Sequence, residues 1–212
     1  KIFICKKLMK KIGIIDYDAG NLFSITNSLK YLKINFIISD KNEELEKCSH
    51  LILPGVGSFL PAMNSLKKKG LDKFIKQSVF KNKPILGICL GMQLLFSQSS
   101  EFGNNIGLNL IKGKVNKIRS NKIKIPIVGW FKFQGLNKNI FSHHNGKYVY
   151  LVHSYECLPD NKKIIIGTYE PTSGKKIICA IQQNNIFAVQ FHPEKSHYAG
   201  IKLLKIFYNY EN

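Results

Sequence analysis

Arginine and acidic side chains are scarce in this chain of 212 residues. Arg119 is the only arginine among 32 basic residues, and 13 acidic residues oppose them, so nearly all of the +19 net charge comes from lysine. The lysines are scattered, and the arginine forks that read base edges are missing. We therefore do not expect a nucleic-acid-binding protein, despite the strong positive charge.

Paired cysteines and long apolar runs are lacking too. The odd number of cysteines, with no C-x-x-C pair, predicts a reduced, cytoplasmic protein. No stretch approaches the roughly 20 apolar residues of a membrane helix, so no membrane association is expected. No residues have zinc-ligand spacing, and neither a metal nor another cofactor is expected. His143 and His144 are predicted to lie on a polar loop with Asn145 and Gly146.

Repeats, linkers and low-complexity segments are also missing, so residues 9–212 are expected to form a single domain. Apolar runs predict strands over residues 12–16, 36–39, 50–53 and 85–88, and helices are expected over 22–32, 59–69, 71–80 and 196–210. This alternation predicts an α/β fold with a mainly parallel central sheet flanked by helices. Between residues 110 and 189 the pattern becomes hairpin-like, which predicts an antiparallel β extension. Residues 1–8 precede Met9 and are expected to be a dispensable upstream extension.

Cys89 has the most informative surroundings in the sequence. It follows an apolar strand-like run, 84–88, and precedes a helix-compatible run, 90–97. Gly87 and Gly91 permit a very tight turn between them, because neither carries a Cβ atom. This is the pattern of a nucleophile elbow, which places the sulfur where a helix N-terminus favours the thiolate. By itself, the pattern fits an inert buried cysteine equally well.

A candidate base and its orienting acid lie far downstream. The strand-like run 186–191 leads into His192-Pro193-Glu194. Residues i and i+2 of an extended chain point to the same side, so His192 and Glu194 should share a face. His192 could take the proton of Cys89, while Glu194 orients the imidazole. A lone histidine is more often structural, but a cysteine in an elbow favours the catalytic interpretation.

A glycine-rich loop could complete the same chemistry. Pro54-Gly55-Val56-Gly57 follows the apolar strand 51–53, and its glycines allow backbone amides to point inward. Attack on a carbonyl creates an oxyanion that needs two such donors. The amides of Val56 and Leu90 are the candidates, although glycine and proline after a strand often mark only a turn.

The motifs P-G-V-G, G-I-C-L-G-M-Q and Q-F-H-P-E, in this order, resemble the class I glutamine amidotransferases from about residue 10 to the end. Within that class, D-Y-D-A-G-N-L-F-S (16–24), G-W (129–130), V-H-S-Y (152–155) and H-P-E-K-S (192–196) are similar to the glutaminase subunits of imidazole glycerol phosphate synthase. The resemblance implies hydrolysis of L-glutamine to glutamate and ammonia through a thioester on Cys89, with His192 and Glu194 completing the triad.

The resemblance also implies a substrate site and a partner. Gly55, Gln93, Ser154 and Tyr155 would hold glutamine; Gln93 stands four residues beyond Cys89, on the same helix face. The ammonia would pass to a (β/α)8-barrel cyclase subunit in a heterodimer. That subunit makes imidazole glycerol phosphate and AICAR from the phosphoribulosyl-formimino precursor in histidine biosynthesis.

Two residues depart from the pattern of these subunits. Where they usually read P-H-x-G-W-N, this chain has Ile127 in place of the histidine and Phe131 in place of the asparagine. This segment is expected to face the partner or to support the glutamine site. A paralogue that supplies ammonia for amidation of a surface-polysaccharide sugar is therefore an alternative. A catalytically decayed partner-binding domain is another, and a cysteine protease is disfavoured because the papain-type signature is missing.

Overall fold

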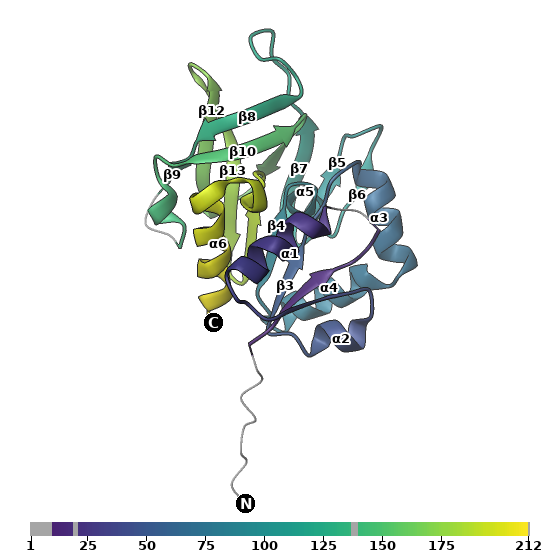
Figure 1. Cartoon of the computed structure of the whole chain (residues 1–212). Coiled ribbons are helices and arrows are strands. Elements are labelled where there is room, and N and C mark those ends of the chain that lie inside the picture. Colours follow the sequence, from purple (N-terminus) through teal and green to yellow (C-terminus); the bar gives the residue numbers. More distant parts are fainter. Residues whose placement is uncertain (1–9, 19–20, 137–139, 212) are drawn as a thin grey trace, which may run out of the picture.

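One large sheet organises the described residues, which are 10–18, 21–136 and 140–211 of a computed structural model (Figure 1). Its strand order within these residues is β2-β1-β3-β4-β14-β13-β12-β9. The parallel part comprises β2 (Phe36–Ser39), β1 (Ile12–Ile15), β3 (His50–Leu53), β4 (Ile85–Ile88) and β14 (Ile186–Val189), and the antiparallel part adds β13 (Lys175–Gln183), β12 (Ile165–Thr172) and β9 (Gln134–Gly135). The predicted parallel sheet with an antiparallel extension is confirmed. The segment 1–8, predicted to be dispensable, lies outside the described residues.

Helices cover both faces of the parallel part. Helices α1 (Leu22–Tyr31) and α6 (His197–Asn209) share one apolar cluster with the sheet, whereas α2 (Asn42–Glu46), α3 (Phe59–Lys68) and α4 (Leu71–Phe80) share the other. Successive strand side chains alternate between the two clusters: Ile14 and Ile52 enter the first, and Ile15 and Leu51 enter the second. A sheet buried on both faces needs apolar residues at every position, which explains the continuous apolar runs. In the described residues, no helix is long and apolar enough to cross a membrane.

Two smaller sheets complete the framework around the end of β4. A ribbon pairs β8 (Ile127–Lys132) with β10 (Tyr148–His153), and a four-stranded sheet has the order β11-β7-β5-β6. Its strands are β11 (Tyr155–Pro159), β7 (Ile111–Lys117), β5 (Phe96–Ser99) and β6 (Asn105–Ile106). The expected helical run 90–97 is wrong beyond residue 94, because α5 (Leu90–Leu94) ends there and β5 pairs in parallel with β7. Pairing and burial of Phe96 override the local helical pattern.

The paired histidines also differ from the expectation. His143 is exposed, but the short 3-10 helix η1 (Ser142–His144) buries His144 to 1% exposure. The Nε2 atom of His144 lies 2.8 Å from the carbonyl oxygen of Ala199 in α6. His144 therefore joins the segment before β10 to α6, and the predicted polar loop is wrong for this residue.

Candidate active site

The Cys89 turn has the strained backbone that the two flanking glycines predict. Cys89 adopts φ 54° and ψ −110° between β4 and α5, and a positive φ is costly for a residue with a side chain. A Cβ on Gly91 would lie 1.8 Å from the carbonyl oxygen of Leu53, and one on Gly87 would lie 2.9 Å from that of Gly91. Only glycine fits at these points, so the sequence encodes a compact elbow that presents the sulfur at the start of α5.

His192 and Glu194 form the closest charged pair of the site. The Nδ1 atom of His192 lies 2.8 Å from Oε1 of Glu194, and both side chains are almost fully buried. The expected contact between His192 and Glu194 is present, but the extended chain that was expected to produce it is not. Pro193 begins the 3-10 helix η3 (Pro193–Lys195), so only His192 is extended. The remaining carboxylate oxygen, Oε2 of Glu194, is buried and has no hydrogen-bond partner in the described residues.

The electrostatics of His192 suit a base that becomes a cation. Burial alone lowers the pKa of His192, but hydrogen bonds and charge interactions with Cys89 and Glu194 outweigh it and raise the pKa from 6.5 to about 10. Hydrogen bonds to a charged form and nearby opposite charges favour that form. An imidazolium between a thiolate and a carboxylate is therefore stable here.

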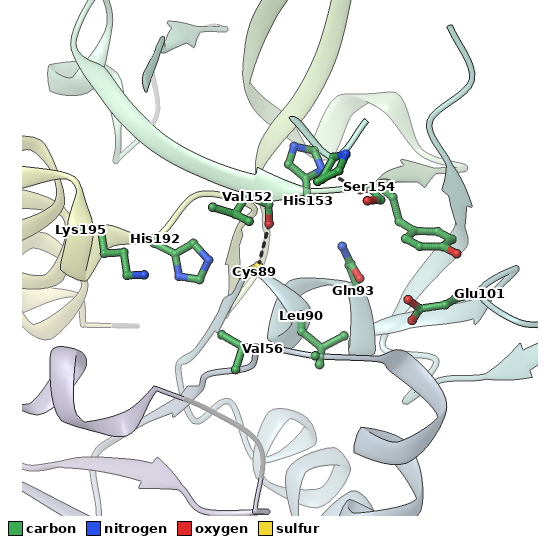
Figure 2. A pocket seen from close by; sticks show the side chains of 13 residues that line it. Val56, Cys89, Leu90, Gln93, Glu101, Val152, His153, Ser154, His192 and Lys195 are labelled. Carbon is green, nitrogen blue, oxygen red and sulfur yellow. Dashed lines mark hydrogen bonds between the residues drawn. The ribbon is translucent and has the colours of Figure 1, made fainter. Parts of the chain in front are cut away.

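A cleft of about 330 Å³ opens over Cys89. Among the predicted site residues, it is lined by Cys89, His192, Val56, Leu90, Gln93, Ser154 and Tyr155. Figure 2 shows His192 and Lys195 on one side of Cys89, and Gln93 and Glu101 on the other. Glu194 contacts His192 but does not line the cleft, and Gly57, not Gly55, lines it.

Gly55 is instead enclosed by Tyr17 and the start of α5. A Cβ on Gly55 would lie 2.5 Å from the Tyr17 hydroxyl and 3.0 Å from the Gly91 nitrogen. The carbonyl oxygen of Gly55 accepts a hydrogen bond of 3.3 Å from the backbone N–H of Leu90. One of the two predicted oxyanion donors is thus occupied by the loop itself.

The comparisons with known proteins agree with this geometry. The model of the family "Glutamine amidotransferase class-I" matches residues 13–209. The chain belongs to this family. Among curated relatives of this amidotransferase, a protein from Chlorobaculum tepidum is 42% identical over 92% of this chain and 98% of its own length, and one from Lactococcus lactis is 44% identical over 94% and 98%. Both are named "Imidazole glycerol phosphate synthase subunit HisH".

Solved structures share the fold of this amidotransferase at lower sequence identity. A structure described as a glutamine amidotransferase superposes with a TM-score of 0.72 at 16% identity, covering 92% of this chain and 98% of that one. The "PurLQS" structure from Thermotoga maritima gives 0.72 at 18% identity, covering 95% and 98%.

The two departures from the subunit pattern face the interior of this amidotransferase. Ile127 is 2% exposed and Phe131 is half-buried, whereas Val128 and Trp130, which alternate with them on β8, are exposed. The period of two along a strand produces this separation. Ile127 and Phe131 therefore lie on the inner face of the ribbon, and neither lines the cleft over Cys89.

Two polar residues of the site escaped the sequence analysis. Gln190 is fully buried, and its Nε2 atom lies 3.6 Å from the Cys89 sulfur, while its Oε1 atom accepts a 3.1 Å hydrogen bond from Gln93. Gln190 stands within the Q-F-H-P-E motif, so its position was visible but its contact was not. Glu101 lines the cleft from the turn after β5, and no sequence signal pointed to it.

Proposed function

We propose that this chain is a glutaminase subunit that hydrolyses L-glutamine to glutamate and ammonia. The observation that carries the proposal is the placement of Cys89, in its elbow, beside the buried His192–Glu194 pair at one cleft. A nucleophile, a base within reach and an acid that orients the base make up the machinery of covalent acyl transfer.

The reaction begins with His192 already holding the proton of the Cys89–His192 pair, because its pKa is raised to about 10. The thiolate attacks the carboxamide carbon of glutamine and forms a tetrahedral oxyanion, which collapses to a thioester as the nitrogen leaves with the proton from His192 as ammonia. Water then attacks the thioester, with His192 as base, and glutamate leaves while the sulfur regains a proton. Glu194 orients the imidazole and stabilises the imidazolium.

Glutamine would lie along the cleft from Cys89 toward Glu101. The carboxylate of Glu101 is the acidic group lining that end, and it fits the α-ammonium group of the substrate. Gln93, Ser154 and Tyr155 offer amide, hydroxyl and backbone groups to the α-carboxylate and the carboxamide. Gly57 takes the close backbone approach first expected of Gly55, because Gly57 lines the cleft and Gly55 does not.

We infer that the proposed oxyanion site, the N–H groups of Val56 and Leu90, is closed until a peptide rotates. Leu90 donates its N–H to the carbonyl oxygen of Gly55, and the Tyr17 hydroxyl donates a 2.6 Å hydrogen bond to the carbonyl oxygen of Pro54. Rotation of the Gly55–Val56 peptide would release the Leu90 N–H and turn the Val56 N–H inward. Because Tyr17 holds the carbonyl oxygen of Pro54, the Gly55–Val56 peptide would rotate without moving Pro54. We therefore expect the isolated chain to hydrolyse glutamine slowly.

We further propose a (β/α)8-barrel cyclase as the partner in a heterodimer, which uses the ammonia to make imidazole glycerol phosphate and AICAR in histidine biosynthesis. The names of the relatives support this assignment at about 40% identity over nearly the whole chain. The exposed ribbon face, formed by Val128, Trp130, Tyr148 and Val152, offers an apolar surface at the rim of the cleft. A cytoplasmic location is part of the proposal and remains a prediction.

The decisive experiment measures glutamate release by the chain alone, with the matching cyclase, and with the cyclase and its ligand. We expect turnover to rise strongly only in the last mixture, and imidazole glycerol phosphate to form from glutamine. Equal rates in all three mixtures would contradict the closed oxyanion site. Strong glutaminase activity without imidazole glycerol phosphate would favour the polysaccharide-type alternative, and no reaction of Cys89 with a glutamine-mimicking electrophile in any mixture would favour a decayed domain.

A further inference from the structure

His153 is a buried residue beside the cleft to which the reaction above gives no role. It ends β10 and is 6% exposed, directly before Ser154 and Tyr155. The Nδ1 atom of His153 lies 2.8 Å from the carbonyl oxygen of Tyr155, and its Nε2 atom lies 2.6 Å from the hydroxyl of Tyr169 on β12. Both ring nitrogens are thus within hydrogen-bond distance of a partner: Nδ1 of the backbone of Tyr155, next to Ser154, and Nε2 of Tyr169 in the large sheet.

The chemistry of these partners fixes the proton on His153. A carbonyl oxygen only accepts, so Nδ1 must carry the hydrogen. Burial lowers the pKa of His153 to about 4, which keeps the ring neutral, and the nearby charge of His192 lowers it in the same direction. In a neutral ring, Nε2 must then accept, and the hydroxyl of Tyr169 donates to it.

The two departures from the family pattern converge on this pair. Ile127 is directly opposite His153 in the β8–β10 ladder, and the ring of Phe131 lies 5.2 Å from that of Tyr169. Both side chains are apolar. Neither side chain carries a donor or acceptor that could compete for the atoms of the hydrogen bond between His153 and Tyr169.

We propose that His153 and Tyr169 form a positioning pair that fixes the Ser154–Tyr155 corner for glutamine. The proposal rests on the glutaminase activity proposed above. The pair touches neither the reacting carbon nor the sulfur, so it acts on substrate binding through the backbone of Tyr155. Because the two atoms come from different sheets, the pair joins the ribbon to β12 at the edge of the cleft.

Replacement of Tyr169 by phenylalanine tests the pair by removing one hydroxyl. In the complex with the cyclase and its ligand, we expect Tyr169→Phe to raise the KM for glutamine about fivefold, the effect of one hydrogen bond, and to leave kcat within about twofold. Tyr31→Phe is the matched control, because Tyr31 is 77% exposed, and its KM should equal that of the wild type. An unchanged KM in a folded Tyr169→Phe variant, or a loss confined to kcat, would overturn the proposal.

A spectroscopic measurement on the free chain separates this proposal from the proposed function. Imidazole ¹⁵N shifts should show His153 as the Nδ1–H tautomer in the wild type and in Tyr169→Phe, with the Nε2 resonance displaced in the variant because Nε2 loses its hydrogen-bond donor. The Nε2–H tautomer in the wild type would refute the pair even if glutamine is hydrolysed. Rescue adds a third readout: His153→Asn keeps a donor near Nδ1 and should retain a lower KM than His153→Leu. Equal KM values for these two folded variants would count against the pair.

Discussion

The contact between Gln190 and the nucleophile leads to a quantitative prediction. The Gln190→Leu substitution preserves much of the buried volume but removes the amide that lies 3.6 Å from the Cys89 sulfur. A hydrogen bond to a charged group contributes about 1.5–3 kcal/mol, and the lower value suits a neutral amide donor and a large acceptor. A loss of about 1.5 kcal/mol corresponds to a tenfold decrease in rate. We therefore expect thiolate reactions of Cys89 to slow about tenfold.

Alkylation of Cys89 by iodoacetamide at pH 7 measures this effect without substrate or partner, and peptide mass spectrometry separates Cys89 from the other cysteines. Gln182→Leu, on the neighbouring strand β13, is the matched control and should alkylate like the wild type. The Gln190 variant should also lose about 1 kcal/mol of unfolding free energy, because Gln93 loses its 3.1 Å partner. If Cys89 in Gln190→Leu reacts as fast as in the wild type, the Gln190 amide does not stabilise the thiolate.

Three further substitutions test other parts of the site. In Glu194→Gln, His192 loses its ionised partner, so its pKa should fall below about 10 and partner-stimulated hydrolysis should fall roughly 10- to 150-fold. Because folding raises the pKa of His192 above 6.5, the His192–Glu194 pair stabilises the fold fully below pH 6.5 and loses this effect toward pH 10. In urea titrations, the difference in unfolding free energy between the wild type and Glu194→Gln should shrink across this pH range. A constant difference would contradict the raised pKa of His192. Gly91→Ala places a Cβ 1.8 Å from the Leu53 carbonyl oxygen and should cost about 3 kcal/mol in urea unfolding, whereas an unchanged midpoint would refute the tight elbow. Cys89→Ala should abolish turnover but retain partner association in gel filtration, and a residual rate near that of the wild type would exclude Cys89 as nucleophile.

The elements and the nucleophile turn were readable from the sequence because they depend on local rules. Buried parallel strands need unbroken apolar runs, and the turn at Cys89 needs glycine at 87 and 91, so β4 and the elbow followed directly. Motif order then brought His192 and Glu194 to the same site. The helix predicted beyond Leu94 failed because pairing of β5 with β7 is a long-range contact that the local pattern does not contain.

Contacts made through the interior were beyond the sequence. Nothing local indicated that Gln190 reaches the sulfur or that Glu101 lines the cleft, because each depends on how separate strands pack. The absence of Gly55 from the cleft lining has the same origin, since its carbonyl oxygen bonds to Leu90 and the residue is buried. His144 appeared polar in the sequence and is buried because α6 offers it a carbonyl oxygen.

The ribbon strand β10 is hydrogen-bonded to the backbone of His192, the proposed base. The N–H of His192 donates a 2.9 Å hydrogen bond to the carbonyl oxygen of Tyr150, and Ser196 links the N–H of Tyr150 to the carbonyl oxygen of His192. The same strand carries Val152, whose carbonyl oxygen lies 3.9 Å from the Cys89 sulfur. If a docked partner shifts β10 and thereby changes the affinity for glutamine, thermodynamic linkage requires glutamine to change the affinity for the partner by the same factor. Occupancy of the cleft would then regulate assembly, and if the partner raises the affinity for glutamine, the complex would persist longest when glutamine is abundant.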